Sequence, residues 1–129
     1  MSGSFIYVGT MRIKPGKVED VHKSMAELVD FVETNEPRMI AFHAYLEEEE
    51  RTLTIVQVHP DAASMEFHMQ INAKHFATAF DSLESVLSEQ YYGEITESLG
   101  DELAKWEDQS VTVTRVTMHA GGFTRTNVV

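Results

Sequence analysis

The pattern of apolar and polar residues along the chain predicts strands that alternate with helices. Residues 5–13 are rich in β-branched and aromatic side chains, which is typical of a strand, and Lys14-Pro15-Gly16-Lys17 supplies a turn after it. Apolar residues then recur at steps of three and four residues, as on a helix with one buried face: Val18, Val21, Met25, Leu28 and Val32. This helix is expected to run to about Asn35, because Pro37 pushes the residue before it away from the helical region.

The middle of the chain predicts a hairpin followed by two helices. Strands are expected at residues 38–48 and 52–59, and the short charged turn between them requires the two strands to be antiparallel. Asp61 can cap a helix that runs from Ala62 to about Gln70. Asn72 can cap a second helix, whose apolar stripe consists of Phe76, Ala79, Phe80, Leu83, Val86 and Leu87.

The end of the chain predicts one more strand of the main sheet and an extension. Residues 91–97 are expected to form a weak fourth strand, residues 99–106 a short helix and residues 111–116 a fifth strand, which pairs with its own sheet or with that of a partner. The order β-α-β-β-α-β predicts an α+β, ferredoxin-like fold, in which an antiparallel sheet carries its helices on one face. We expect one domain at residues 5–97 and an extension at residues 98–129 that packs on the domain or on the dimer partner.

The second face of this sheet is expected to carry large apolar residues, whichever side of each strand faces the helices. In the second strand, for example, Phe42 and Leu46 stand on one side and Met39 and Tyr45 on the other. A monomer would then expose a larger apolar patch than soluble monomers usually show. We therefore expect a homodimer whose sheets face each other and form a dimeric α/β barrel.

Composition and charge exclude several classes of function. The chain has 129 residues, 10 of them basic and 21 acidic, and its net charge of −11 repels nucleic acid and anionic membrane surfaces. The absence of cysteine excludes disulfides, thiol nucleophiles, thiolate haem ligation and iron–sulfur clusters. We expect neither a signal peptide nor a membrane span, and a cytoplasmic location is the natural setting for such a chain.

Two segments resemble a known family. The run Ile13-Lys14-Pro15-Gly16-Lys17 before a helix, and the later segment from His68 to His75-Phe76, are similar to the antibiotic biosynthesis monooxygenase domain of the dimeric α/β-barrel superfamily. The resemblance covers about residues 5–97. It implies a homodimer with one pocket per subunit between sheet and helices. For some members it also implies oxidation of quinols, anthrones or related hydroxylated aromatics by O2 without metal or flavin.

The residues needed for such chemistry are present in the sequence. A cofactor-free oxygenation requires a base and an apolar cavity, and His68 and His75 are candidate bases because histidine titrates near neutral pH. Aromatic residues that could form the wall of a pocket for a small apolar or aromatic substrate are Tyr7, Phe42, Tyr45, Phe67, Phe76 and Phe80. The phenylalanines at helical spacing fit a packed core better than a ligand-binding wall.

Other functions remain open at this point. A ligand-binding or structural homodimer is the main alternative, and the fold also hosts isomerases and haem-degrading oxygenases. In the haem-degrading relatives an asparagine and a histidine serve the haem, and their places fall near Gly9 and Phe80. Neither of these side chains can hydrogen-bond or ligate iron, although His75, one turn away from Phe80, could substitute for the histidine. His43 and His59 could share a metal only if the register of the hairpin places them on one face. Phosphate-loop, nucleophile-elbow and zinc-protease motifs are absent from the sequence.

Overall fold

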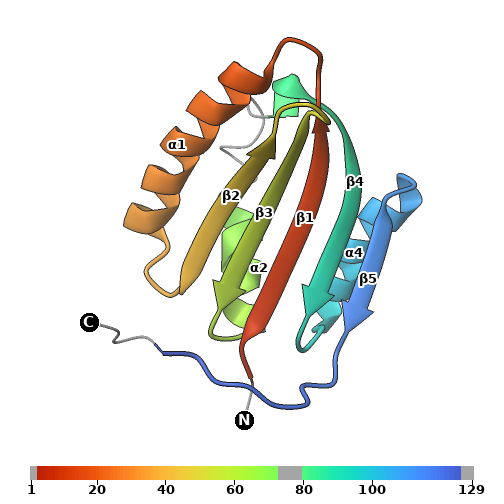
Figure 1. Cartoon of the computed structure of the whole chain (residues 1–129). Coiled ribbons are helices and arrows are strands. Elements are labelled where there is room, and N and C mark those ends of the chain that lie inside the picture. Colours follow the sequence, from red (N-terminus) through yellow and green to blue (C-terminus); the bar gives the residue numbers. More distant parts are fainter. Residues whose placement is uncertain (1–2, 73–79, 126–129) are drawn as a thin grey trace.

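The computed structural model describes residues 3–72 and 80–125 (Figure 1). The elements in chain order are β1 (Phe5–Ile13), α1 (Val18–Asn35), β2 (Ala41–Glu47), β3 (Thr52–His59), α2 (Ala62–Asn72), the 3-10 helix η1 (Phe80–Ser82), β4 (Leu83–Tyr92), α4 (Glu97–Asp108) and β5 (Thr112–Val116).

The strands form one open sheet in the order β2-β3-β1-β4-β5. The first four strands pair antiparallel, with β1 between β3 and β4, which is the ferredoxin-like arrangement that the sequence predicts. The fifth strand, β5, pairs with β4 of the same chain and runs parallel to it, so that the sheet is mixed. The α+β fold class is confirmed, and the strand whose pairing the sequence left open extends its own sheet.

The helices lie on one face of the sheet, and this face holds the core (Figure 1). In β1 and β3 the odd-numbered residues are buried beneath the helices, whereas the even-numbered residues are half-buried on the opposite face. Helix α1 contributes one stripe to the core, namely Val21, Met25, Leu28 and Val32. Helix α4, which the Thr96 hydroxyl caps by accepting from the backbone N–H of Leu99, contributes Leu99 and Leu103.

The bounds of β1, α1 and β3 agree with the sequence prediction, and α2 extends two residues beyond it to Asn72. The prediction of helical structure from Leu83 onward was wrong. Residues 83–92 form β4, which pairs with β1 and β5, and the predicted strand at residues 91–97 instead contains the end of β4 and the start of α4. Pairing with two neighbours decided this segment, although Leu83 and Leu87 also fit a helical spacing.

The face of the sheet that none of the described helices covers is largely apolar or uncharged. Figure 1 looks onto this face. In register across it stand Ile6, Val8, Val56, Val58, Tyr92 and Val116, together with threonines and Arg12. Among the described residues, no helix combines the length and the apolarity that crossing a bilayer would require.

Candidate functional site

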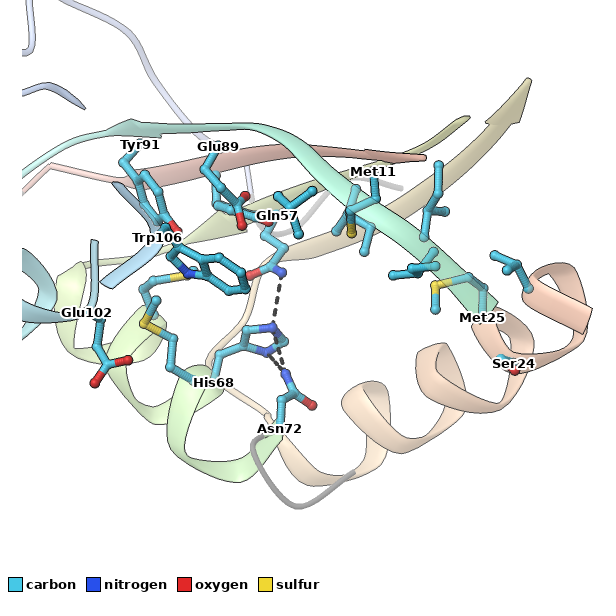
Figure 2. Close-up of a pocket in the computed structure, with 18 residues that line it drawn as sticks. Met11, Ser24, Met25, Gln57, His68, Asn72, Glu89, Tyr91, Glu102 and Trp106 are labelled. Carbon is cyan, nitrogen blue, oxygen red and sulfur yellow. Dashed lines mark hydrogen bonds between the residues drawn. The ribbon is translucent and has the colours of Figure 1, made fainter. Parts of the chain in front are cut away.

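A cavity of about 280 Å³ lies between the sheet and the helices (Figure 2). Its walls come from the buried, odd-numbered side of β1 and β3, from β4, and from α1, α2 and α4. Most of the lining is apolar: Met11, Val21, Met25, Leu53, Ile55, Met65, Met69, Leu83 and Val86. Polar lining residues gather around His68 and around Glu89, and Ser24 of α1 and Glu102 of α4 lie apart from both places.

His68 projects from α2 into the cavity and is only 4% exposed. Its Nδ1 lies 2.9 Å from both oxygens of Glu36, a buried residue that directly follows α1. An ionised carboxylate only accepts hydrogen bonds, so Nδ1 carries the proton and Nε2 of His68 is the acceptor. Gln57 donates to Nε2 over 3.0 Å, and the Asn72 amide nitrogen lies 2.6 Å from the ring nitrogens. Glu36 therefore fixes the tautomer and the orientation of His68.

The hydrogen bonds continue from Gln57 to the neighbouring histidine of β3. His59 Nε2 donates to Gln57 Oε1 over 2.9 Å, so His59 Nδ1 accepts from the Ser64 hydroxyl, 2.7 Å away. Burial, followed by the effect of nearby His68, lowers the pKa of His59 to about 3, which keeps this ring neutral. We name the five residues Ser64, His59, Gln57, His68 and Glu36 the histidine chain. In each contact along this chain, one atom donates and the other accepts.

A second polar place lies at the centre of the sheet, where Tyr7 and Glu89 meet. Gly9 of β1 stands opposite Glu89 of β4, and Tyr7 stands opposite Tyr91. A Cβ atom at Gly9 would lie 2.0 Å from the Tyr7 hydroxyl oxygen and 2.6 Å from Glu89 Oε2, so both polar groups occupy the space above this glycine. We name Tyr7, Gly9 and Glu89 the tyrosine–glutamate corner.

Burial controls the ionisation of this corner. Glu89 is 4% exposed, and its Oε2 has no hydrogen-bond partner among the described residues. Burial raises the pKa of Glu89 to about 7, and the approach of the Tyr7 hydroxyl opposes only part of this rise. Burial, and then the charge of Glu89, raise the pKa of Tyr7 well above its usual value. Tyr7 is therefore protonated at neutral pH, whereas the Glu89 carboxyl changes its charge at a pH close to neutral.

The structure brings two of the predicted site residues into this cavity, His68 and Tyr7. Phe42 lies on the same face of the sheet, with its ring centroid 6.2 Å from that of His68, but it lines a second cavity of about 190 Å³ that Glu36 also lines. Tyr45 is 61% exposed on the opposite face, because the register of β2 places it beside Thr54. Phe67 is 47% exposed on α2, away from the cavity.

Three predicted site residues cannot be placed in the cavity. His75 and Phe76 lie outside the described residues. Phe80 begins η1, and its side chain also lies outside the described part of the chain. Of the two candidate bases, His68 is the one that lies among the described residues.

The two-histidine metal site does not form. His43 pairs with Val56 on the open face of the sheet, whereas His59 is buried on the covered face. Within residues 3–72 and 80–125, no group of three or more His, Cys, Asp or Glu residues is placed to hold a metal ion. Gly9, at the place where haem-degrading relatives carry an asparagine, instead makes room for Tyr7 and Glu89.

Sequence reasoning missed Gln57, Glu36 and Glu89. A signal for Gln57 was available, because it occupies the buried side of a strand whose other members on that side are Leu53, Ile55 and His59. Glu36 carries no comparable signal, since it contacts His68 only through the tertiary fold. Glu89 was missed because its segment was not recognised as the start of a strand.

Comparisons with known proteins agree with this architecture. Residues 4–82 match the family model described as antibiotic biosynthesis monooxygenase. No curated protein matches the sequence. MupZ from Pseudomonas fluorescens superposes with a TM-score of 0.73 at 16% identity, over 98% of this chain and 98% of its own.

Two further solved structures match about 70% of the chain. Protein SO0527 from Shewanella oneidensis has a TM-score of 0.61 at 22% identity, over 70% of this chain and 89% of its own. A conserved protein from Methanosarcina mazei Go1 has a TM-score of 0.60 at 20% identity, over 69% of this chain and 90% of its own. At such identities the structures establish a shared fold, and of these three the MupZ match also spans α4 and β5.

Proposed function

The chain belongs to the antibiotic biosynthesis monooxygenase family, and we propose that it is a cofactor-independent monooxygenase that oxidises a hydroxylated aromatic, quinol or anthrone-like molecule with O2. The observation that carries this proposal is the buried His68, which Glu36 orients at the wall of an apolar cavity. An apolar cavity limits the access of water to reactive intermediates, and a correctly oriented imidazole can take a proton there.

His68 acts as the base that removes the acidic proton of the substrate. The Glu36 carboxylate stabilises the resulting imidazolium across the 2.9 Å contact. Protonated Nε2 then needs an acceptor in place of a donor. Asn72 Oδ1 is buried and has no partner among the described residues, so rotation of the Asn72 amide would present an acceptor to the new N–H.

Deprotonation makes the substrate electron-rich enough to reduce O2. One electron passes from the carbanion or phenolate to O2, and the superoxide and the organic radical then combine to form a C–O bond. The peroxide takes back the proton from His68 and eliminates water. For an anthrone-like CH2 group the net reaction converts CH2 and O2 into C=O and H2O, so that the substrate supplies all the electrons.

Oxygen uptake tests this function directly. We expect the purified protein to consume O2 with anthrones or quinols at a rate that a chelator does not change. Replacing His68 with Gln should lower kcat roughly 100- to 10,000-fold, as for loss of a general base. The matched control is His22→Gln, because His22 is exposed on α1. A silent panel of substrates, or an undiminished rate in His68→Gln, would contradict the proposal.

The alternative is a non-catalytic ligand-binding or structural homodimer. One observation favours it: the ring nitrogens of His59 and His68 all contact other side chains, as in a network that serves stability. Under this alternative, phenols would bind to the protein and quench Trp106 fluorescence in the cavity wall, but no O2 would be consumed.

We also propose that the chain forms a homodimer through the open face of the sheet. Val56 lies in the middle of this face, with Val8 and His43 opposite it on the two neighbouring strands. A lysine there would place charges against each other in a sheet-to-sheet interface. Sedimentation velocity should show a dimer for the wild type and a monomer for Val56→Lys; equal mass for both would contradict this interface.

A further inference from the structure

The tyrosine–glutamate corner contains a buried polar atom that the fold itself leaves unsatisfied. Glu89 Oε2 has no partner among the described residues, although the residue is 4% exposed. Native proteins satisfy nearly all such atoms, so an exception at the wall of a cavity indicates that something else binds it. Glu89 lies in the cavity lining together with Tyr7 and Tyr91.

We propose that Tyr7 and Glu89 form an oxygen-binding subsite that donates two hydrogen bonds to the substrate oxygen on which negative charge develops. This inference rests on the proposed function, because it assumes that His68 removes a proton from the same substrate. It assigns Tyr7 and Glu89 to the reaction in addition to His68. It also restricts the substrate to molecules with an oxygen that gains negative charge on deprotonation.

The chemistry of the two groups suits an oxyanion. Tyr7 keeps its proton at neutral pH, and a Glu89 carboxyl that titrates near pH 7 is protonated in a large fraction of molecules and can donate. A tyrosine beside a carboxylic acid kept neutral by burial is an established way to stabilise a dienolate oxygen. The other titratable groups that line the cavity are His68 from α2, Tyr91 from β4 and Glu102 from α4.

The subsite lies on the covered face of the sheet, and the base faces this part of the sheet from α2. Tyr7 stands opposite Gln57, the hydrogen-bond partner of His68, on one side and opposite Tyr91 on the other. Strands are about 4.8 Å apart, so β3 and β4, with β1 between them, are separated by roughly 10 Å. Figure 2 shows Glu89 projecting from the sheet and His68 from the helix below it, toward the same space.

This separation selects a kind of substrate. The acidic hydrogen must face His68 while the oxygen that gains the charge faces Tyr7 and Glu89, and conjugation must connect the two positions. A fused-ring ketone with its acidic CH2 on the edge opposite the carbonyl, as in anthrone, meets this condition. A catechol, whose oxygens are adjacent, does not. The cavity of about 280 Å³ is at the small end of ligand pockets, which suits a compact fused-ring molecule.

Gly9 is the residue that permits this arrangement. An added Cβ would fall within 2.0 Å of the Tyr7 hydroxyl and 2.6 Å of the Glu89 carboxyl. Gly9→Ala therefore displaces both donors without removing either. It is a second way to test the subsite, independent of the chemical groups themselves.

The binding of 2-naphthol, measured by absorbance and by Trp106 fluorescence, tests the subsite without relying on turnover. We expect Tyr7→Phe, Glu89→Leu and Gly9→Ala each to raise the Kd roughly 2- to 10-fold, as for loss of a hydrogen bond between neutral groups. Glu84→Gln is the matched control, because Glu84 is exposed on the same strand as Glu89. Circular dichroism checks that each variant is folded, and Tyr7→Phe changes almost no volume.

The pH dependence separates this role from a merely structural one. The pH dependence is measured with 2,4-dinitrophenolate, which stays anionic over this range. Below pH 7 the protonated Glu89 carboxyl donates a hydrogen bond to the ligand oxygen, and above it the carboxylate repels that oxygen, so the affinity of the wild type should fall as pH rises through about 7. In Glu89→Gln the amide donates at every pH, so the fall should disappear. All other residues of the cavity are the same in both proteins, so the comparison isolates the effect of Glu89.

The outcomes distinguish this inference from the proposed function. If no substrate supports O2 uptake but 2-naphthol binding still depends on Tyr7 and Glu89, the oxygenase function is wrong and the subsite stands. If anthrone is oxidised at unchanged kcat and KM in Tyr7→Phe and Glu89→Leu, the subsite is wrong. Failure of the wild type to bind 2-naphthol at all, or equal Kd values across the variants, overturns it as well.

Discussion

The histidine chain and the tyrosine–glutamate corner share one cavity but differ in how their polar atoms are satisfied. Along the histidine chain each donor meets an acceptor within 3.0 Å, and the neutral state of His59 is part of that pattern. At the corner the Glu89 carboxyl is buried with one oxygen unpartnered among the described residues. A complete network holds its members in place, whereas an incomplete one retains capacity for a ligand.

The comparison also assigns opposite effects of pH to the two regions. His59 has a lowered pKa, so the folded protein binds fewer protons there than the unfolded chain does. Glu89 has a raised pKa, so the folded protein binds more. A falling pH therefore weakens the fold through His59 in the histidine chain, and a rising pH weakens it through Glu89 in the tyrosine–glutamate corner.

Acid unfolding provides the strongest test of the histidine chain. The pKa of His59 falls from 6.5 to about 3, so its stabilising contribution is complete above pH 6.5 and is lost as pH falls toward 3, by up to roughly 5 kcal/mol. The free energy of unfolding in urea, measured from pH 7 to pH 3, should therefore drop more steeply in the wild type than in His59→Gln. His22→Gln, on the exposed side of α1, should follow the wild type. Parallel curves for the wild type and His59→Gln would refute the assignment.

Removing the central link should destabilise the fold by a similar or smaller amount. Gln57→Leu leaves the His59 N–H without its acceptor and His68 without the amide at Nε2, and each buried unpaired group costs about 1–3 kcal/mol. We expect a loss of roughly 2–6 kcal/mol in urea unfolding at pH 7. Gln70→Leu, at an exposed position of α2, should change stability by less than about 0.5 kcal/mol. Similar losses in both variants would show that Gln57 is not a link.

At the tyrosine–glutamate corner, replacing the buried polar residue Glu89 with Gln should stabilise the protein, and only at high pH. Burial raises the pKa of Glu89 from 4.5 to about 7, so ionising it costs nothing below pH 4.5 and up to about 3 kcal/mol above pH 7. Glu89→Gln removes this cost and should be more stable than the wild type at pH 8 but not at pH 4. Glu84→Gln serves as the exposed control. A gain that is equal at both pH values would show that ionisation is not its cause.

Local pattern predicted the first half of the fold well. The proline and glycine after β1, the apolar stripe of α1 and the charged turn before β3 act over a few residues, and these elements have the predicted bounds. β4 did not follow its local pattern, because pairing with β1 and β5 outweighs the helical spacing of Leu83 and Leu87.

The candidate site divides in the same way. His68 and Tyr7 could be proposed from residue type and family resemblance, and both line the cavity. The alternation in β3 could also have revealed Gln57, a polar residue on a buried side. The exposure of Tyr45 followed from the register of β2, and that of Phe67 from the facing of α2, neither of which residue type alone can specify.

The sequence by itself determined the order of the early elements, the acidic net charge and the presence of a histidine, His68, between apolar neighbours, because these depend on composition and on residues a few positions apart. The tertiary structure decided which polar groups meet. Glu36 reaches His68 across 32 residues of chain, and Glu89 meets Tyr7 only because β4 pairs beside β1 with Gly9 opposite Glu89. Contacts between residues so far apart in the chain, and the burial that moves their pKa values, exist only once the sheet has formed.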